Sequence, residues 1–286
     1  MSENRDAIWI RLMRANDIPL GLSLCRFAGW NQLEDDWRRL LTLNPQNVFV
    51  AECGGVPCGT ASVTCYDAKL AWIGMVLVHP DRRRHGVGGA LIQHSLDFLH
   101  TARVECIKLD ATEQGRRVYL KHAFEDERPI DRCLAAIQPG AFECHLPPIE
   151  ETDWRDIGYL DLDVFGADRL PLLKHLARDG VTAVASSPDG IQGYGFARAG
   201  FNATYLGPVV ATNNKCARDV VTSLLGKLPA DRGVYWDVFP ENVDALELAQ
   251  SLGFHVERSL TRMRYGTLAS VTNIDRVYGA SGFETG

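Results

Sequence analysis

Four basic side chains and three glycines stand together between an apolar run that closes at Pro80 and a second apolar pattern beyond it. They are Arg82, Arg83, Arg84, His85, Gly86, Gly88 and Gly89. Glycine permits positive φ and lets a ligand approach the main chain closely. The first amides of a helix have no intrahelical acceptor and carry partial positive charge. The segment therefore predicts an anion site at a helix N-terminus, suited to phosphate or pyrophosphate, with a glycine-rich turn flanked by solvated arginines as the structural alternative.

Two common phosphate-binding loops do not fit this segment. A P-loop requires GxxxxGK[ST], and no Lys-Ser or Lys-Thr pair follows these glycines. A dinucleotide fingerprint requires GxGxxG, but Ala90 and Leu91 follow the glycines, so the third glycine is missing. A nucleotide-binding oxidoreductase is therefore disfavoured.

The segment instead resembles the acyl-CoA loop of the GNAT N-acetyltransferase superfamily, which commonly reads VxPxxRxxGxGxxL. All six fixed positions are filled, by Val78, Pro80, Arg83, Gly86, Gly88 and Leu91. The strands and helices expected before the loop also come in the order of that family. The chain is similar to a GNAT acetyltransferase, and the resemblance implies acetyl-CoA as co-substrate.

The resemblance also implies which residues would contact that co-substrate. The strand that ends at Val78 would separate from its neighbour and pair with the pantetheine arm, the amides of the loop would hold the pyrophosphate, and the amide of Val76 would donate to the developing oxyanion. The implied cofactor-binding residues are Val76, Leu77, Val78, Arg83, Arg84, His85, Gly86, Val87, Gly88, Gly89, Ala90 and Thr112.

A second family signature, N..A..LY...GF, is expected about 40 residues after the loop. The stretch TEQGRRVYLKHAF places Thr112, Gly115 and Tyr119 at its Asn, Ala and Tyr positions, and Ala123 replaces the glycine. The resemblance implies that Tyr119 is the catalytic acid that protonates the CoA thiolate. A phenol with a pKa near 10 is protonated at neutral pH. The alternative for Tyr119 is an ordinary core tyrosine.

The elements that must position these residues are strands and helices in alternation. Strands are expected at 7–13, 70–80, 106–112 and 130–137, a hairpin at 47–67, and helices at 14–29, 33–43, 88–102 and 116–124. The prolines and glycine of residues 138–150 interrupt this order. Beyond them it repeats: helical at 153–180, a hairpin at 181–200, strands at 202–211, 233–238 and 256–265, and helices at 216–228 and 241–254.

The repeat predicts two tandem domains, at 1–140 and 146–286. Each is expected to be an α/β domain with a mixed, mostly antiparallel sheet flanked by helices. The second copy keeps Asn242, Gly253 and Phe254 of the later signature, but Ala249 stands at the tyrosine position and TNNKCARDVV contains no glycine. We therefore expect catalysis in the first domain, and a degenerate second domain that shapes the acceptor pocket or binds a regulatory ligand.

The acceptor side is less marked in the sequence. In this fold the first two helices and their loop border the acceptor, which here points to Trp30, Asn31, Glu34 and Asp35; Tyr66 is a further candidate. Carboxylates there would attract an ammonium group and accept its proton. Equally, Asn31 resembles a helix cap, and acidic residues suit the first turn of a helix.

Composition excludes several classes of protein. The formal net charge of −6 argues against a nucleic-acid-binding body. The start of the chain lacks a signal sequence, and no apolar run approaches the ~20 residues of a membrane span. The eight cysteines form no CxxC pair and no zinc spacing. We expect a cytoplasmic protein with reduced thiols, no metal, and neither nucleic-acid nor membrane partners.

Together these observations predict an acetyl-CoA-dependent N-acetyltransferase that transfers acetyl directly to a primary amine of a small molecule or peptide. The alternative is a catalytically weak acyl-CoA-binding or ligand-sensing regulatory module. The sequence leaves open the acceptor, the general base and the oligomeric state, for which a homodimer is one alternative.

Overall fold

The computed structural model describes residues 7–138, 140–143, 145–229, 232–266 and 272–286, which form two compact units. Unit 1 contains the described residues of 1–127, with 262–266 and 284–286; unit 2 contains those of 128–261 and 272–283. The expected domains 1–140 and 146–286 stay a prediction; in this division of the described residues, each unit also includes residues from the other range. Two long strands, β6 (Glu125–Ala136) and β11 (His255–Gly266), each contribute residues to both units, and hydrophobic patterning within one strand cannot report which unit its residues join.

Unit 1 is a mixed sheet flanked by helices. Its strands are β1 (Ile8–Leu12), β2 (Val48–Cys53), β3 (Val56–Tyr66), β4 (Leu70–Val78) and β5 (Cys106–Ala111), in that spatial order, followed by the end of β11. Its helices are α1 (Ile18–Phe27), α2 (Glu34–Leu43), α3 (Val87–Thr101) and α4 (Glu113–Tyr119). Strands β1 to β4 are antiparallel, and β5 is parallel to β4.

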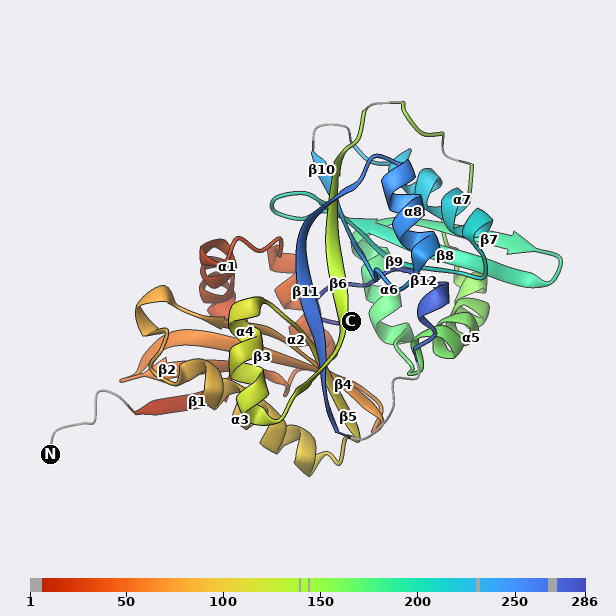
Figure 1. The fold of residues 1–286 in the computed structure, drawn as a ribbon. Coiled ribbons are helices and arrows are strands. Elements are labelled where there is room, and N and C mark those ends of the chain that lie inside the picture. Colours follow the sequence, from red (N-terminus) through yellow and green to blue (C-terminus); the bar gives the residue numbers. More distant parts are fainter. Residues whose placement is uncertain (1–6, 139, 144, 230–231, 267–271) are drawn as a thin grey trace, which may run out of the picture. The chain divides into compact units, whose positions relative to one another are not determined.

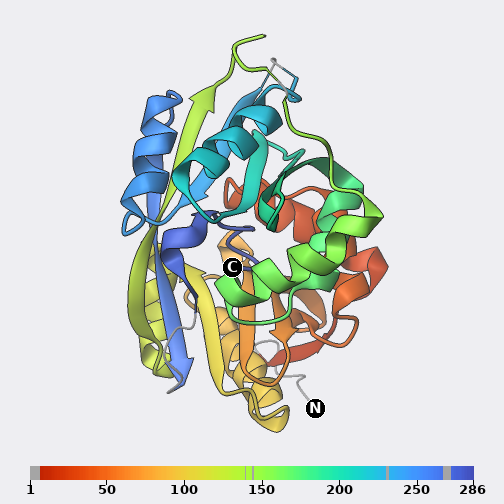
Figure 2. The same ribbon diagram turned by 90° about the vertical axis from the view of Figure 1, so that its right-hand side faces the viewer.

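The alternation of side chains along β2 separates the two layers of helices. Phe49 and Ala51 face a core shared with α3 and α4, whereas Val48 and Val50 face a core shared with α1 and α2. Figures 1 and 2 show these two pairs of helices on opposite sides of the sheet. Successive side chains of a strand point to opposite faces, so a strand buried on both sides separates two cores. The sheet of unit 1 thus has an α3/α4 face and an α1/α2 face.

Strands β4 and β5 separate along their length. Their register pairs join Leu70–Trp72 to Cys106–Lys108, and among the described residues no strand continues the pairing along the β5-facing edge of 73–78. In the same stretch Met75 has a positive φ of 52°. Here Thr60 pairs with Leu77 and Ser62 with Gly74, leaving two residues of β4 opposite one of β3. This β-bulge turns the backbone of β4 where the two parallel strands part.

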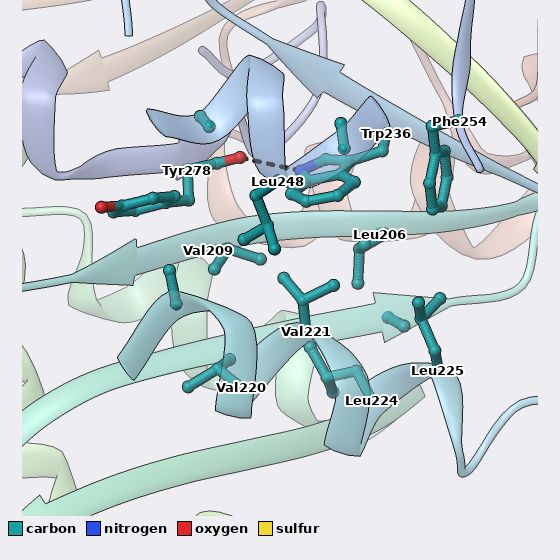
Figure 3. Packing of buried hydrophobic residues seen from close by; sticks show 14 of the residues in the cluster. Leu206, Val209, Val220, Val221, Leu224, Leu225, Trp236, Leu248, Phe254 and Tyr278 are labelled. Carbon is teal, nitrogen blue, oxygen red and sulfur yellow. Dashed lines mark hydrogen bonds between the residues drawn. The ribbon is translucent and has the colours of Figure 1, made fainter. Parts of the chain in front are cut away.

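Unit 2 repeats the plan. Its strands are β6, β7 (Gly180–Ser187), β8 (Gly190–Arg198), β9 (Thr204–Ala211), β10 (Gly233–Val238), β11 and β12 (Val277–Gly279), with the order β6-β10-β9-β8-β7. Its helices are α5 (Trp154–Phe165), α6 (Leu170–Asp179), α7 (Asn214–Leu225) and α8 (Val243–Ser251). Figure 3 shows its core, where α7 and α8 pack on β9 and β10 around Trp236.

Two features of unit 2 differ from the sequence-based expectation. The helical stretch expected at 153–180 is two helices, because Gly166 ends α5 with a left-handed φ of 90°. Strand β12 was not expected, since three residues are too few to show a periodic pattern.

Candidate functional site

The loop between β4 and α3 combines a tight turn with exposed positive charge. A single 3₁₀ turn at Pro80–Arg82 leads to positive φ angles at Arg84 (65°) and Gly86 (84°), and α3 begins at Val87. The first bond to a residue four positions earlier is Ala90 N–H to Gly86 O, at 2.9 Å. The preceding amides at the helix start have no such acceptor and are available to an anion.

The basic side chains of this loop have different surroundings. The Arg83 guanidinium is half-buried, and its Nε donates to the carbonyl of Val78 at 3.1 Å, which ties the loop to the end of β4. Arg84 and His85 are exposed beside the free end of the helix. The His85 Nδ1 atom lies 2.9 Å from the carbonyl of Arg83. Arg83 therefore shapes the loop, while Arg84 and His85 present charge to solvent.

The predicted strand contacts lie where β4 leaves β5. Val76 is one of the two bulge residues, and Leu77 and Val78 complete the unpaired edge. The hydroxyl of Thr60 donates to the carbonyl of Met75 at 2.9 Å, which holds the bulge from the neighbouring strand. An extended ligand can pair with this edge as an additional strand would.

Tyr119 ends α4 and is 8% exposed. Its ring packs on Phe124, and desolvation raises its pKa above the ordinary value of 10. No described residue forms a hydrogen bond with its hydroxyl. The phenol is thus protonated at neutral pH and is available to a ligand. The position is consistent with both the acid and the core tyrosine, so its role stays a prediction.

The residues around Tyr119 explain the second signature physically. Thr112 is the N-cap of α4, its hydroxyl accepting from Gly115 N–H at 3.1 Å. A side chain at Gly115 would lie 3.0 Å from the Tyr119 ring. Ala123 takes a left-handed φ of 61°, and Gly253 takes 87° at the matching step of unit 2. The glycine of the family pattern therefore reflects a left-handed turn before the phenylalanine.

His122 is a residue near the loop that sequence reasoning missed. Its Nε2 atom would lie 3.5 Å from a Cβ placed on Gly89, at the start of α3. Desolvation lowers the pKa of its imidazole. Nothing in the local sequence distinguishes this histidine, because the proximity depends on how α4 and its following turn pack against α3.

The predicted acceptor residues have varied positions. Trp30 is half-buried, Asn31 is buried, and Glu34 and Asp35 are exposed at the start of α2, where Glu34 forms an ion pair with Arg38. The N-cap of α2 is Leu33, so Asn31 does not cap this helix. The carboxylate of Asp36 accepts from Leu33 N–H at 2.8 Å instead.

Tyr66 contacts a part of the chain that the sequence analysis did not connect with the site. Its hydroxyl donates to the carbonyl of Thr285 at 2.6 Å. Residues 284–286 belong to unit 1, and the Gln32 amide donates to the Glu284 carboxylate at 3.1 Å. This segment therefore lies among the residues predicted to border the acceptor.

The corresponding region of unit 2 is closed by its own chain. Asn213 caps α7, accepting from Cys216 N–H at 3.0 Å. Strand β8 pairs with one edge of β9 at Val209 and Val210, so β12, which pairs with the same two residues, occupies the other edge. The indole N–H of Trp236 donates to the carbonyl of Tyr278 in β12 at 2.8 Å (Figure 3). The β9 edge that corresponds to the unpaired edge of β4 is thus already filled.

Other kinds of site find little support in the part of the chain that is described. There, no group of three or more His, Cys, Asp or Glu residues is arranged to hold a metal ion. Burial raises the pKa of the Cys25 and Cys133 thiols to about 12, which keeps them protonated. None of the described helices is long and apolar enough to cross a membrane.

Comparison with known proteins places both halves of the chain in the same family of domains. Residues 44–126 and 157–279 each match a family model described as an acetyltransferase (GNAT) domain. A Bacillus subtilis (strain 168) protein named "Uncharacterized N-acetyltransferase YitH" is 24% identical over 257 residues, which are 88% of this chain and 89% of that protein.

Solved structures show the same fold over the whole chain. A putative acetyltransferase from Pyrococcus horikoshii has a TM-score of 0.85 at 22% identity, covering 100% of this chain and 98% of that one. A tandem GNAT protein from the clavulanic acid biosynthesis pathway has a TM-score of 0.66 at 14% identity, covering 92% and 100%. At these identities the likeness concerns the fold.

Proposed function

Because this chain belongs to the GNAT acetyltransferases and carries two GNAT domains in tandem, we propose that unit 1 alone transfers an acetyl group from acetyl-CoA directly to a primary amine. Acyltransferase activity follows from the family. The choice of unit, the site residues and the direct route to an amine are the proposal.

The observation that carries the proposal is the contrast between two matching edges. In unit 1 the β4 edge at 73–78 has no strand partner among the described residues and leads into the glycine-rich loop. In unit 2 the β9 edge is paired with β12, and the helix after it is capped by Asn213. An extended pantetheine arm needs an unpaired edge, and a pyrophosphate needs free amides. Unit 1 meets both requirements.

Residues of unit 1 are assigned three roles in acetyl transfer: binding the pyrophosphate, stabilising the oxyanion and protonating the leaving sulfur. Acetyl-CoA, when bound, supplies an activated thioester. We assign the Val76 amide to donate a hydrogen bond to the oxygen that becomes negative when the amine attacks. The Tyr119 hydroxyl, kept protonated by burial, is assigned to give its proton to the sulfur as the C–S bond breaks. The nitrogen that has formed the new C–N bond loses its extra proton to solvent, and the Tyr119 phenolate is reprotonated from solvent. The loop amides from Arg84 to Gly88, with the charges of Arg84 and His85, hold the pyrophosphate and so fix the distance between thioester and amine. The Arg83 amide, which the sequence also assigned to the pyrophosphate, donates to the carbonyl of Pro80 at 3.3 Å instead.

Calorimetric titration of acetyl-CoA tests the site. Gly86→Trp puts a bulky side chain on the loop at a positive φ, and Gly29→Trp imposes the same backbone strain at another exposed glycine, with φ 67° and no atom within 4 Å of its added Cβ. We expect one binding site in the wild type and Gly29→Trp, and at least about tenfold weaker binding in Gly86→Trp, equivalent to about 1.4 kcal/mol.

The same titration can refute the proposal. Absence of acetyl-CoA binding, or equal affinity in Gly86→Trp and Gly29→Trp, would exclude the loop as the site. CoA release measured across a panel of primary amines then tests acetyl transfer. Tight binding without release of CoA for any amine would favour the regulatory alternative.

A further inference from the structure

We propose that Arg258 and Tyr235 of unit 2 form a binding site for the carboxylate of a ligand. Both residues belong to unit 2, whereas the acetyl-CoA site is proposed in unit 1. A ligand site is one of the two roles that the sequence leads us to expect of the second domain. The inference does not depend on acetyl transfer by unit 1.

One face of the unit 2 sheet carries charged and phenolic side chains. Along β10, Trp236 points into the core that contains α7 and α8 (Figure 3), so its neighbours Tyr235 and Asp237 point to the opposite face. Asp237 is the register partner of Arg132 in β6, and the Arg132 guanidinium lies 5.0 Å from the centre of the Tyr235 ring. These three side chains therefore share the face that α7 and α8 do not cover.

Arg258 of β11 lies beside these groups. Its guanidinium and that of Arg132 both lie over the Phe283 ring, at 5.7 and 4.2 Å from the ring centre. The Arg258 side chain is half-buried, and its Nε atom is buried without a hydrogen-bond partner. No ion pair or hydrogen bond joins this guanidinium to another of the described residues. Arg258 therefore carries a partly desolvated positive charge that none of the described carboxylates binds.

The two carboxylates that act on Arg258 do not neutralise it. Asp237 accepts two bonds from Arg132, both at 2.7 Å, and one from the Tyr205 hydroxyl at 2.8 Å. Glu257 is exposed and, as the neighbour of Arg258 in the strand, points to the other face of the sheet. Burial, and next the like charge of Arg132, lowers the pKa of Arg258 below its ordinary value. A half-buried cation of this kind is stabilised by an anion that binds to it.

Arg258 and Tyr235 together match a carboxylate. A guanidinium presents planar N–H donors to the two oxygens of a carboxylate, and a phenol can donate a further hydrogen bond to one of them. Tyr235 is close enough to influence the pKa of Arg258. Its side chain is half-buried, and no described residue forms a hydrogen bond with its hydroxyl. A phosphate dianion, with two charges and more acceptor oxygens, would require more than one unpaired cation and one hydroxyl.

The test uses benzoate as probe and benzamide as its uncharged counterpart, both titrated calorimetrically into the full-length protein. In the wild type we expect benzoate to bind about tenfold more tightly than benzamide, as charge-assisted bonds to a half-buried guanidinium predict. This preference should disappear in Arg258→Gln. Tyr235→Phe keeps the ring, removes one donor and should weaken benzoate binding about fivefold. Arg178→Gln removes an exposed arginine of unit 2 and should retain the wild-type preference.

Equal binding of benzoate and benzamide to the wild type would overturn the inference, as would an undiminished preference in Arg258→Gln and Tyr235→Phe. Inorganic phosphate that binds as tightly as benzoate would exclude a site built for a carboxylate. Loss of the preference in Arg84→Gln, with Arg258→Gln retaining it, would place benzoate on the loop of unit 1 instead. Acetyl-CoA should bind equally to the wild type and Arg258→Gln, so failure of the proposed function is measured separately from failure of this inference.

Discussion

Replacing Tyr119 with phenylalanine should lower kcat about 100-fold and leave the affinity for acetyl-CoA unchanged. General acid catalysis by a positioned side chain contributes about 10²–10⁴-fold, and the substitution removes only the phenolic proton donor. Burial raises the pKa of Tyr119 above 10. The acid form is lost as pH rises through the pKa, so no decline of kcat from this group is expected below about pH 10.

The structure also predicts that the substitution does not unfold the protein. The Tyr119 ring packs on Phe124 and lies against Gly115, and phenylalanine keeps these contacts. Since no described residue hydrogen-bonds to the hydroxyl, its removal leaves none of the described polar groups unsatisfied. We expect a free-energy change within about 0.5 kcal/mol, which corresponds to a change in Tm of no more than about 2 °C.

The assay follows free CoA with a thiol reagent at saturating acetyl-CoA and the best amine of the panel, and calorimetry gives the affinity for acetyl-CoA. Tyr265→Phe is the matched control, because its ring also packs on Phe124 but belongs to β11. It should retain full activity. An unchanged kcat in Tyr119→Phe, or a loss of acetyl-CoA affinity as large as the loss of kcat, would refute the assignment of Tyr119 as the acid.

Two predictions concern stability. Ala123 has a left-handed φ of 61°, so Ala123→Gly should stabilise the fold by about 0.5–1 kcal/mol. This value is the backbone strain that glycine relieves, minus the extra entropy that glycine gives the unfolded chain. Calorimetry should show a rise in Tm of about 1–4 °C, and a fall would contradict this reasoning. Hydrogen bonds from Arg11, the larger cause, and from the Arg14 amide hold the Asp17 pKa below its usual 3.8. The stability that ionised Asp17 contributes is therefore present above the pKa of Asp17 in the unfolded chain, and it is lost as pH falls through the pKa of Asp17 in the folded protein. Asp17→Asn should lower Tm at pH 7 and by progressively less toward pH 2. A difference in Tm that does not depend on pH would exclude this ion pair as the cause.

The sequence predicted the local elements of the site well, because turn chemistry and periodicity are local. The hairpin turn at Gly54 and Gly55, the strand that ends before Pro80 and the helix that starts beside Gly88 all occur as expected. The strand and helix around the second signature also occur. The family and the tandem α/β fold are confirmed by the comparisons and the structure.

The paired β9 edge of unit 2 could be predicted only indirectly. The missing glycines of TNNKCARDVV indicated that this copy differs, but they did not reveal what replaces a ligand there. The structure places β12 on the β9 edge and Asn213 on the start of α7. A three-residue strand contributed from far along the chain has no periodic pattern, so only its pairing identifies it.

The glycine-rich loop, the helix after it and the strand before it can be predicted from sequence, because each depends on residues within a few positions of one another. Three features become visible only in the folded chain: β4 and β5 part after Trp72, β6 and β11 contribute to both units, and Glu284 lies against Gly74. Contacts between positions 74 and 284 depend on chain topology and on the absence of a single side chain, and no local pattern encodes either.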